Sequence, residues 1–140
     1  MATFVKFRDF VEQLGAGVHN LKATGHTLNV YLTNSAPDVS AHVKKADLAG
    51  ITEQHGYAAA DIQNDYTETA GVGTLTAVDV VWTASGGSFG PFQYAVVYND
   101  TPTSPFADPL VCYWDYGSSI TCLTGEKFTV NFGTSVLTLT

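Results

Sequence analysis

The segment Gly90–Thr101 constrains the fold more than any other part of the chain, because apolar side chains occupy both faces of a strand-length run. In an extended conformation, one face would carry Phe92, Tyr94, Val96 and Tyr98. The opposite face would carry Gln93, Ala95 and Val97. A glycine-rich run precedes the segment, and Asn99-Asp100-Thr101-Pro102 ends it with turn-forming residues. This pattern predicts a central strand that needs a layer of structure on each side.

Turn signals recur about every ten residues from residue 60 onward, which is typical of consecutive strands. Strands are predicted at Thr27–Thr33, Asp61–Thr69, Thr74–Thr83, Lys127–Phe132 and Ser135–Thr140, with a hairpin formed by Leu110–Tyr116 and Ser119–Leu123. The prediction is an all-β fold, an antiparallel β-sandwich of jelly-roll type with about eight strands. Its expected core consists of Leu28, Val30, Val78, Val80, Trp82, Phe92, Tyr94, Val96, Tyr98, Trp114, Phe128, Val130 and Phe132.

The N-terminal region carries a helical pattern. Apolar residues recur at steps of three and four from Phe4 to Leu14, which predicts a short helix over Lys6–Leu14. The arm Met1–Val5 either pairs as an edge strand or reaches a neighbouring molecule. With 140 residues, the chain is expected to form a single domain over 1–140, in which 1–26 is an arm and helix region that contacts partners. Asp38–Tyr57 is predicted to be mostly loop, with a short helix or strand near Lys45–Ile51.

The charge distribution bears on the class of partner. The chain has 14% charged residues and a net charge of −7, and an acidic chain of this kind is not expected to bind nucleic acid. Few charges favour a protein that lies against a partner. Residues 1–45 have a net charge of +2 and residues 46–140 a net charge of −9. The first third is therefore expected to dock on an acidic neighbour, although uneven sampling of few charges explains the split equally well.

The sequence has no run of membrane-spanning length, so no membrane partner is expected. Met1–Phe10 lacks the apolar run of a signal peptide, and two cysteines are too few for a disulfide framework, which together favour a reducing cytoplasm. If Tyr116-Gly117-Ser118 forms a hairpin tip, Cys112 and Cys122 lie nearly opposite each other. Two buried free thiols are the favoured interpretation.

No combination of residues predicts an enzyme, a metal site or a cofactor. The four histidines, at positions 19, 26, 42 and 55, show no close pair of the kind that binds zinc. The serines lie in ordinary turns, and no spacing rule joins the carboxylates into an acid and base pair. A calcium site near Asn99-Asp100 has little support. The many aromatic residues could form a sugar-stacking platform, but their strand pattern favours a core and an interface.

Several runs of the sequence share their motifs with one protein family. They are V-V-W-T-A-S-G-G-S-F-G-P-F-Q-Y-A-V-V-Y-N-D-T (Val80–Thr101), Trp114–Leu123, G-E-K-F-T-V-N-F (Gly125–Phe132), F-R-D-F-V-E-Q-L-G-A-G-V-H-N-L (Phe7–Leu21) and Leu28–Asn34. In these runs the chain resembles small head proteins of tailed bacteriophages, in particular the capsid cement or decoration proteins. The resemblance is weakest over Asp38–Tyr57, and Cys122 stands where the family would have an apolar residue.

The resemblance implies a non-enzymatic protein, made in the bacterial cytoplasm, that binds the outside of the virion head and bridges major capsid subunits. It also implies self-association, as a homodimer or alternatively a trimer. Together with the basic N-terminal third, it suggests a set of docking residues: Phe4, Lys6, Phe7, Arg8, Phe10, Lys44 and Lys45. The alternative function is a tail or fibre module that binds a glycan receptor through aromatic side chains. A small hydrolase would need a catalytic pocket.

Overall fold

The computed structural model describes residues 2–140, so Met1 of the predicted arm lies outside the described residues. In chain order the elements are β1 (Thr3–Lys6), α1 (Arg8–Gly15), β2 (Leu28–Thr33), the 3-10 turn η1 (Lys45–Asp47), β3 (Ala60–Asp61), β4 (Asp65–Thr69), β5 (Val72–Thr76), β6 (Val80–Thr83), β7 (Phe89–Asn99), β8 (Leu110–Cys122), β9 (Lys127–Val130) and β10 (Leu137–Leu139). All strand pairs are antiparallel, which confirms the predicted all-β class. Over 2–140, no helix has the length and apolar character needed to cross a bilayer.

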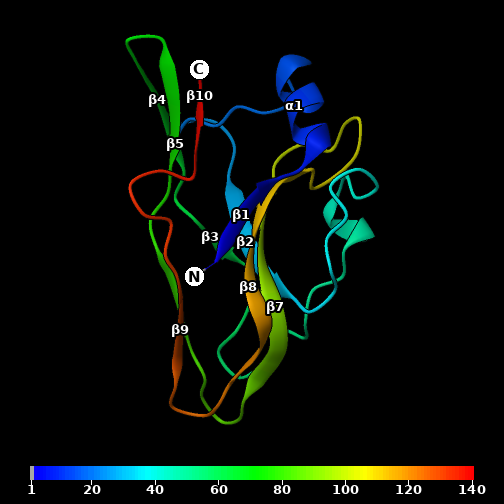
Figure 1. Cartoon of the computed structure of the whole chain (residues 1–140), viewed down its shortest axis with the longest axis vertical. Coiled ribbons are helices and arrows are strands. Elements are labelled where there is room, and N and C mark those ends of the chain that lie inside the picture. The colour runs from blue at the N-terminus through cyan, green and yellow to red at the C-terminus, as the bar shows by residue number, and fades with distance from the viewer. Residues whose placement is uncertain (1) are drawn as a thin grey trace.

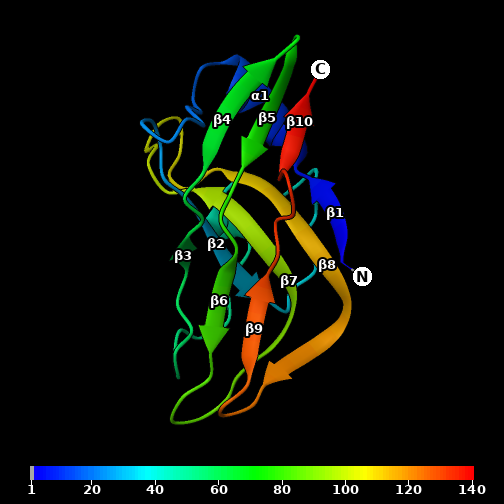
Figure 2. The ribbon, with the colours of Figure 1, turned by 90° about the vertical axis from the view of Figure 1, so that its left-hand side faces the viewer.

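The strands form two facing layers (Figure 1). One layer is a five-stranded sheet in the order β1-β8-β7-β2-β3. In the other layer β5 continues into β6 and β9 into β10, so that a sheet β10-β5-β4 lies above a pair β6-β9 (Figure 2). The main core fills the space between the layers and contains Phe89, Phe92, Leu75 and Val130. Burial of these side chains is the main source of stability.

Strand β7 lies in the middle of the five-stranded sheet, as the opening pattern predicts. Its alternation is not continuous, because the pairing with β8 shifts register between Phe92 and Tyr94. Phe92 therefore faces the main core, whereas Val96 and Tyr98 face the other side of the sheet. The predicted single face of four aromatic and aliphatic residues is wrong for this reason, since a bulge reverses which side alternate residues occupy.

A second, smaller core covers the other side of the sheet. It consists of Phe7, Tyr31, Leu48, Val96, Tyr98 and Leu110. Part of its cover comes from the predicted loop region, in which η1 is the short helical turn expected near Lys45–Ile51. Tyr31 holds this cover in place, because its hydroxyl donates a 2.7 Å hydrogen bond to the carbonyl oxygen of Leu48. The loops thus act as a third layer over part of the sheet.

Three of the predicted strand assignments are wrong. The expected hairpin at Tyr116-Gly117-Ser118 is absent, because β8 runs without a turn from Leu110 to Cys122. Four residues bulge out between its paired positions Asp115 and Ile120, where the amide of Gly117 donates to the Asp115 carboxylate. Cys112 consequently pairs with Val97 and Cys122 with Phe89, so the cysteines are not opposite each other. Both are buried free thiols, as the favoured interpretation predicts.

The predicted strand Asp61–Thr69 is divided between β3 and β4, which belong to different sheets. The predicted strand Thr74–Thr83 is split into β5 and β6. Between them the amide of Val78 donates to the carbonyl of Ile62, and the Val78 side chain is 52% exposed, so its assignment to the core is wrong. Of the other predicted core residues, Tyr94, Trp114 and Phe128 are partly buried and pack against the cores. The remainder are buried as predicted: Leu28, Val30, Val80, Trp82, Phe92, Val96, Tyr98, Val130 and Phe132.

Candidate functional site

Strand β1 is the exposed edge of the five-stranded sheet, as one of the two interpretations of the arm requires (Figure 2). It pairs with β8 on one side, and no strand among residues 2–140 pairs with its other edge. Phe4 is 39% exposed and lies edge-to-face on Trp114, with 5.5 Å between ring centroids. Free backbone N–H and C=O groups on such an edge can pair with a strand of another molecule.

Two basic side chains lie at the C-terminal end of this edge strand. Lys6 ends β1, Arg8 begins α1, and both are exposed. Within residues 2–140, neither side chain forms an ion pair. The ion pair in this part of the chain joins Lys44 and Asp47. We refer to Phe4, Lys6 and Arg8, together with the free edge of β1, as the edge surface. It can offer backbone hydrogen bonds, an aromatic contact and positive charge to a partner.

Phe7 and Phe10 are wrongly predicted as docking residues, because the structure buries both. Phe7 is 0% exposed and belongs to the second core, where its ring lies 5.4 Å from that of Tyr113. Phe10 is 1% exposed, points from α1 into the main core and packs on His19 at 5.0 Å. Phe7 lies in extended backbone just before α1, so the two rings enter different cores, Phe7 the second core and Phe10 the main core.

Lys44 and Lys45 lie at η1 and contact their own chain. The Lys44 ammonium is 3.9 Å from the Asp47 carboxylate and lies over the Phe106 ring. The Lys45 ammonium lies 5.3 Å and 5.0 Å from the ring centroids of Tyr31 and Tyr98. Cation–π contacts of this kind stabilise the loop cover. These two lysines are not part of the edge surface.

A hollow of about 350 Å³ lies beside the start of β1. Ala2, Trp114, Tyr116, Thr129 and Asn131 line it, so aromatic rings from β8 meet polar side chains from the β9 region. The rings are half-buried, because Trp114 packs on Phe132 and Tyr116 on Phe128. The hollow thus combines two aromatic rings with the hydroxyl of Thr129 and the amide of Asn131.

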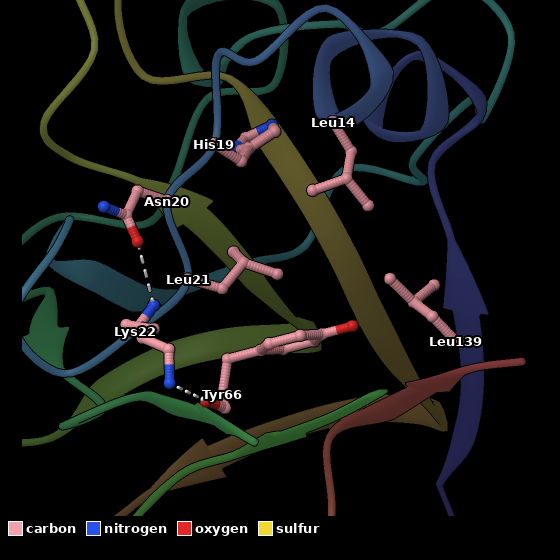
Figure 3. Close-up of a pocket in the computed structure, with 7 residues that line it drawn as sticks. All are labelled: Leu14, His19, Asn20, Leu21, Lys22, Tyr66 and Leu139. Carbon is pink, nitrogen blue, oxygen red and sulfur yellow. Dashed lines mark hydrogen bonds between the residues drawn. The ribbon is translucent and has the colours of Figure 1, made fainter. Parts of the chain in front are cut away.

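A second hollow, of about 370 Å³, lies between the C-terminal end of α1, β4 and β10 (Figure 3). Its lining includes Leu14, Leu21, Leu139, Tyr66 and His19. Leu21 belongs to the segment between α1 and β2, which buried Asn64 fixes to the sheet. The Asn64 amide donates to the carbonyls of Leu21 and His26 and accepts from the amide of Leu28.

A buried polar network lies behind this hollow. The Asn99 side-chain oxygen accepts from the amide of Thr101, so its nitrogen faces the histidines and lies 3.0 Å from Nδ1 of both His19 and His26. The backbone amide of Asn20 donates to His26 Nδ1, so His26 Nδ1 is an acceptor and takes one N–H of the Asn99 side chain as well. The second N–H of Asn99 then donates to His19 Nδ1, and the proton of neutral His19 is on Nε2. Within residues 2–140, Nε2 is buried without a hydrogen-bond partner.

Burial, with a smaller contribution from the positive charge of His26, lowers the pKa of His19 from 6.5 to about 4. Between these two pH values the unfolded chain binds a proton that the folded chain does not, so the free energy of unfolding falls as pH falls. We expect the loss to begin near pH 6.5, to finish near pH 4 and to total about 3 kcal/mol at most. Urea denaturation across this range measures it.

His19→Gln should remove this part of the pH dependence, whereas His42→Gln, outside the network, should keep it. An equal slope in wild type and His19→Gln would show that His19 does not titrate as its burial requires. The sequence contained little sign of the network, because Asn99 and the two histidines are far apart along the chain. The single signal was an asparagine directly after an apolar strand.

Among the described residues, the thiols and carboxylates lie outside the linings of these two hollows. Over 2–140, no three histidine, cysteine or acidic side chains come together in a group that could hold a metal ion. Burial raises the pKa of the Cys112 and Cys122 thiols, which keeps them protonated at neutral pH. Burial and the negative charge of Asp100 raise the pKa of Asp108, while Lys45 opposes this. The Asp100 and Asp108 carboxylates both belong to the loop that joins β7 to β8.

Comparisons with family models, with curated proteins and with solved structures find no match to this chain. The resemblance to phage head proteins therefore depends on the sequence motifs given above.

Proposed function

We propose that this chain is a structural, non-enzymatic capsid cement protein that binds the outer surface of a tailed-phage head and bridges its major capsid subunits. In this proposal the two strand layers are a jelly roll and the edge surface is the docking site. The observation that carries it is the unpaired edge of β1 with exposed Phe4 and Lys6. The sequence motifs, through their resemblance to phage head proteins, are the reason for choosing a capsid as the partner.

Docking through an edge strand fits the proposed function physically. A partner strand would gain backbone hydrogen bonds along β1, an aromatic contact at Phe4 and attraction between its acidic groups and Lys6 or Arg8. A protein that binds the assembled shell more tightly than its separated subunits stabilises the shell by that difference in affinity. Many identical weak contacts over one shell add up, particularly if copies of the cement protein also hold each other.

The proposal predicts that Lys6→Glu weakens binding to phage heads at least about tenfold, because it reverses a charge beside the docking edge at a cost above about 1.4 kcal/mol. Co-sedimentation with heads stripped of the protein measures occupancy. Substitution is preferable to deletion of the arm, because residues up to Arg8 include buried Phe7. Lys127→Glu is the matched control, since it makes the same charge change at an exposed residue that pairs with Thr83 in the other strand layer.

Full occupancy by a folded Lys6→Glu protein would contradict docking through the edge surface. Failure of wild type to bind heads at any concentration tested would contradict the cement function itself. Added salt should weaken wild-type binding, because the proposed attraction between exposed charges is screened.

A second candidate function is favoured by the hollow beside β1, lined by Trp114, Tyr116 and Asn131. A tail or fibre module would bind a glycan there by stacking a sugar ring on an indole or phenol ring. Binding of the isolated protein to a glycan array, lost in a folded Trp114→Ala variant, would favour this function over cement. Binding to heads without any glycan binding would exclude it.

A further inference from the structure

The hollow between α1, β4 and β10 has the composition of a small-molecule site. At about 370 Å³ its volume lies in the range of ligand pockets. Three leucines, at positions 14, 21 and 139, and the Tyr66 side chain provide most of its wall (Figure 3). These four side chains come from four separate segments, so the hollow forms only in the folded chain. An apolar wall of this kind binds apolar groups by removing them from water.

One polar group in this wall lacks a partner. His19 lines the hollow, is 8% exposed, and its Nε2 has no hydrogen-bond partner among residues 2–140. The contact between Asn99 and His19 Nδ1 places the proton on Nε2, so the unpaired group is a donor. A buried donor without an acceptor is unfavourable, and an acceptor that reaches it removes that penalty, less the cost of taking the acceptor itself out of water.

The wall carries no carboxylate, and its one ammonium group belongs to a lysine that is exposed at the rim. Lys22 borders the hollow, but its ammonium donates a 3.2 Å hydrogen bond to the carbonyl of Tyr66, on the strand edge (Figure 3). The hollow therefore presents mainly apolar surface, with Asn20 and Lys22 exposed at its rim and the neutral N–H donor of His19 buried behind it. This chemistry selects uncharged ligands over anions and cations, because a charge would have to leave water without a partner.

We propose that this hollow binds a small uncharged apolar molecule that carries one carbonyl oxygen, with the carbonyl accepting a hydrogen bond from His19 Nε2. The apolar part lies against the three leucines and Tyr66. Because Nε2 is buried, the carbonyl reaches it by passing between these side chains. The site is independent of the edge surface, and its proposed ligand does not depend on the proposed cement function.

A matched pair of probes tests the role of the carbonyl. 4-Phenyl-2-butanone and butylbenzene have nearly the same size and shape, but only the ketone has an acceptor. NMR titration of the whole protein is expected to shift the methyl signals of Leu14, Leu21 and Leu139 with both probes. The ketone should bind about tenfold more tightly, which is the effect of one additional hydrogen bond to a buried donor. It alone should shift the His19 Nε2 resonance.

Two variants locate the site. Leu139→Trp fills the hollow and should abolish binding of both probes, whereas Leu123→Trp, at a residue that is 57% exposed and outside the lining, should leave both affinities unchanged. His19→Phe retains an aromatic ring without the donor and should remove the tenfold preference for the ketone. If His19→Phe does not fold, the preference measured in the wild-type protein still tests the role of the donor.

Three results would overturn the proposal. The first is the absence of methyl shifts at the solubility limit of both probes. The second is equal affinity for ketone and hydrocarbon in the wild-type protein. The third is tighter binding of 4-phenylbutyrate than of the ketone, which would show that the hollow selects an anion.

Discussion

Truncation of Phe7 to alanine is expected to lower the free energy of unfolding by about 3–5 kcal/mol, the range for large core aromatic residues. Phe7 is 0% exposed and joins β1 to α1. Its ring packs on Tyr113, and its amide donates to the carbonyl of Val111, so it fixes the start of the helix against β8. Removing the ring leaves a cavity in the smaller core, where few side chains are available to fill it.

Phe4→Ala is the matched control for this prediction. Phe4 lies three residues earlier on the same arm but is 39% exposed, so its truncation should cost less than about 1 kcal/mol. Urea denaturation of both variants measures the two values. A similar loss of unfolding free energy in Phe7→Ala and Phe4→Ala would show that the arm does not divide into a buried and an exposed part. Together the pair separates the structural role of the arm from its proposed docking role.

Gly56→Ala is expected to cost at least about 3 kcal/mol, because conformational strain and a backbone collision act together. Gly56 has a φ of 92°, a region that favours glycine. An added Cβ would lie 2.2 Å from the carbonyl oxygen of Thr83. Thr83 ends β6 and pairs with Lys127, so moving its carbonyl disturbs the β6-β9 pair. Thermal and urea denaturation would show the loss.

Gly125→Ala separates the two causes. Gly125 has a nearly equal φ of 90°, but no atom lies within 4 Å of an added Cβ. This variant should therefore show the conformational cost alone, about 1 kcal/mol. If Gly56→Ala is no more destabilising than Gly125→Ala, the close approach of Thr83 does not constrain the loop.

The all-β class and most strand positions could be predicted because alternation and turn residues are local properties of the sequence. Strand β7 and strand β2 show this, since their apolar residues and flanking turns define them without any knowledge of their neighbours. The helix at Arg8–Gly15 was predicted from its periodicity and differs from the expected Lys6–Leu14 by two residues at its start and one at its end.

The errors arose where long-range pairing overrides a local signal. Tyr116-Gly117-Ser118 has turn-forming residues, but β7 pairs with β8 on both sides of this point and converts the turn into a bulge. Phe7 and Phe10 were assigned to a docking surface from the basic charge of the first third and the family resemblance, neither of which shows which side chains the fold buries. The network of His19, Asn99 and His26 joins distant segments, and its one local signal, the asparagine at the end of an apolar strand, does not reveal the histidines.

The pairing of β1 with β8 also determines when the proposed docking edge can exist. Thr3 pairs with Asp115, more than 100 residues later in the chain. During synthesis, which proceeds at about 5–20 residues per second, β1 leaves the ribosome long before its partner strand does. Its docking edge takes shape only after β7 and β8 have folded together. A truncated or misfolded copy would therefore lack the edge, and only complete copies would compete for places on a partner.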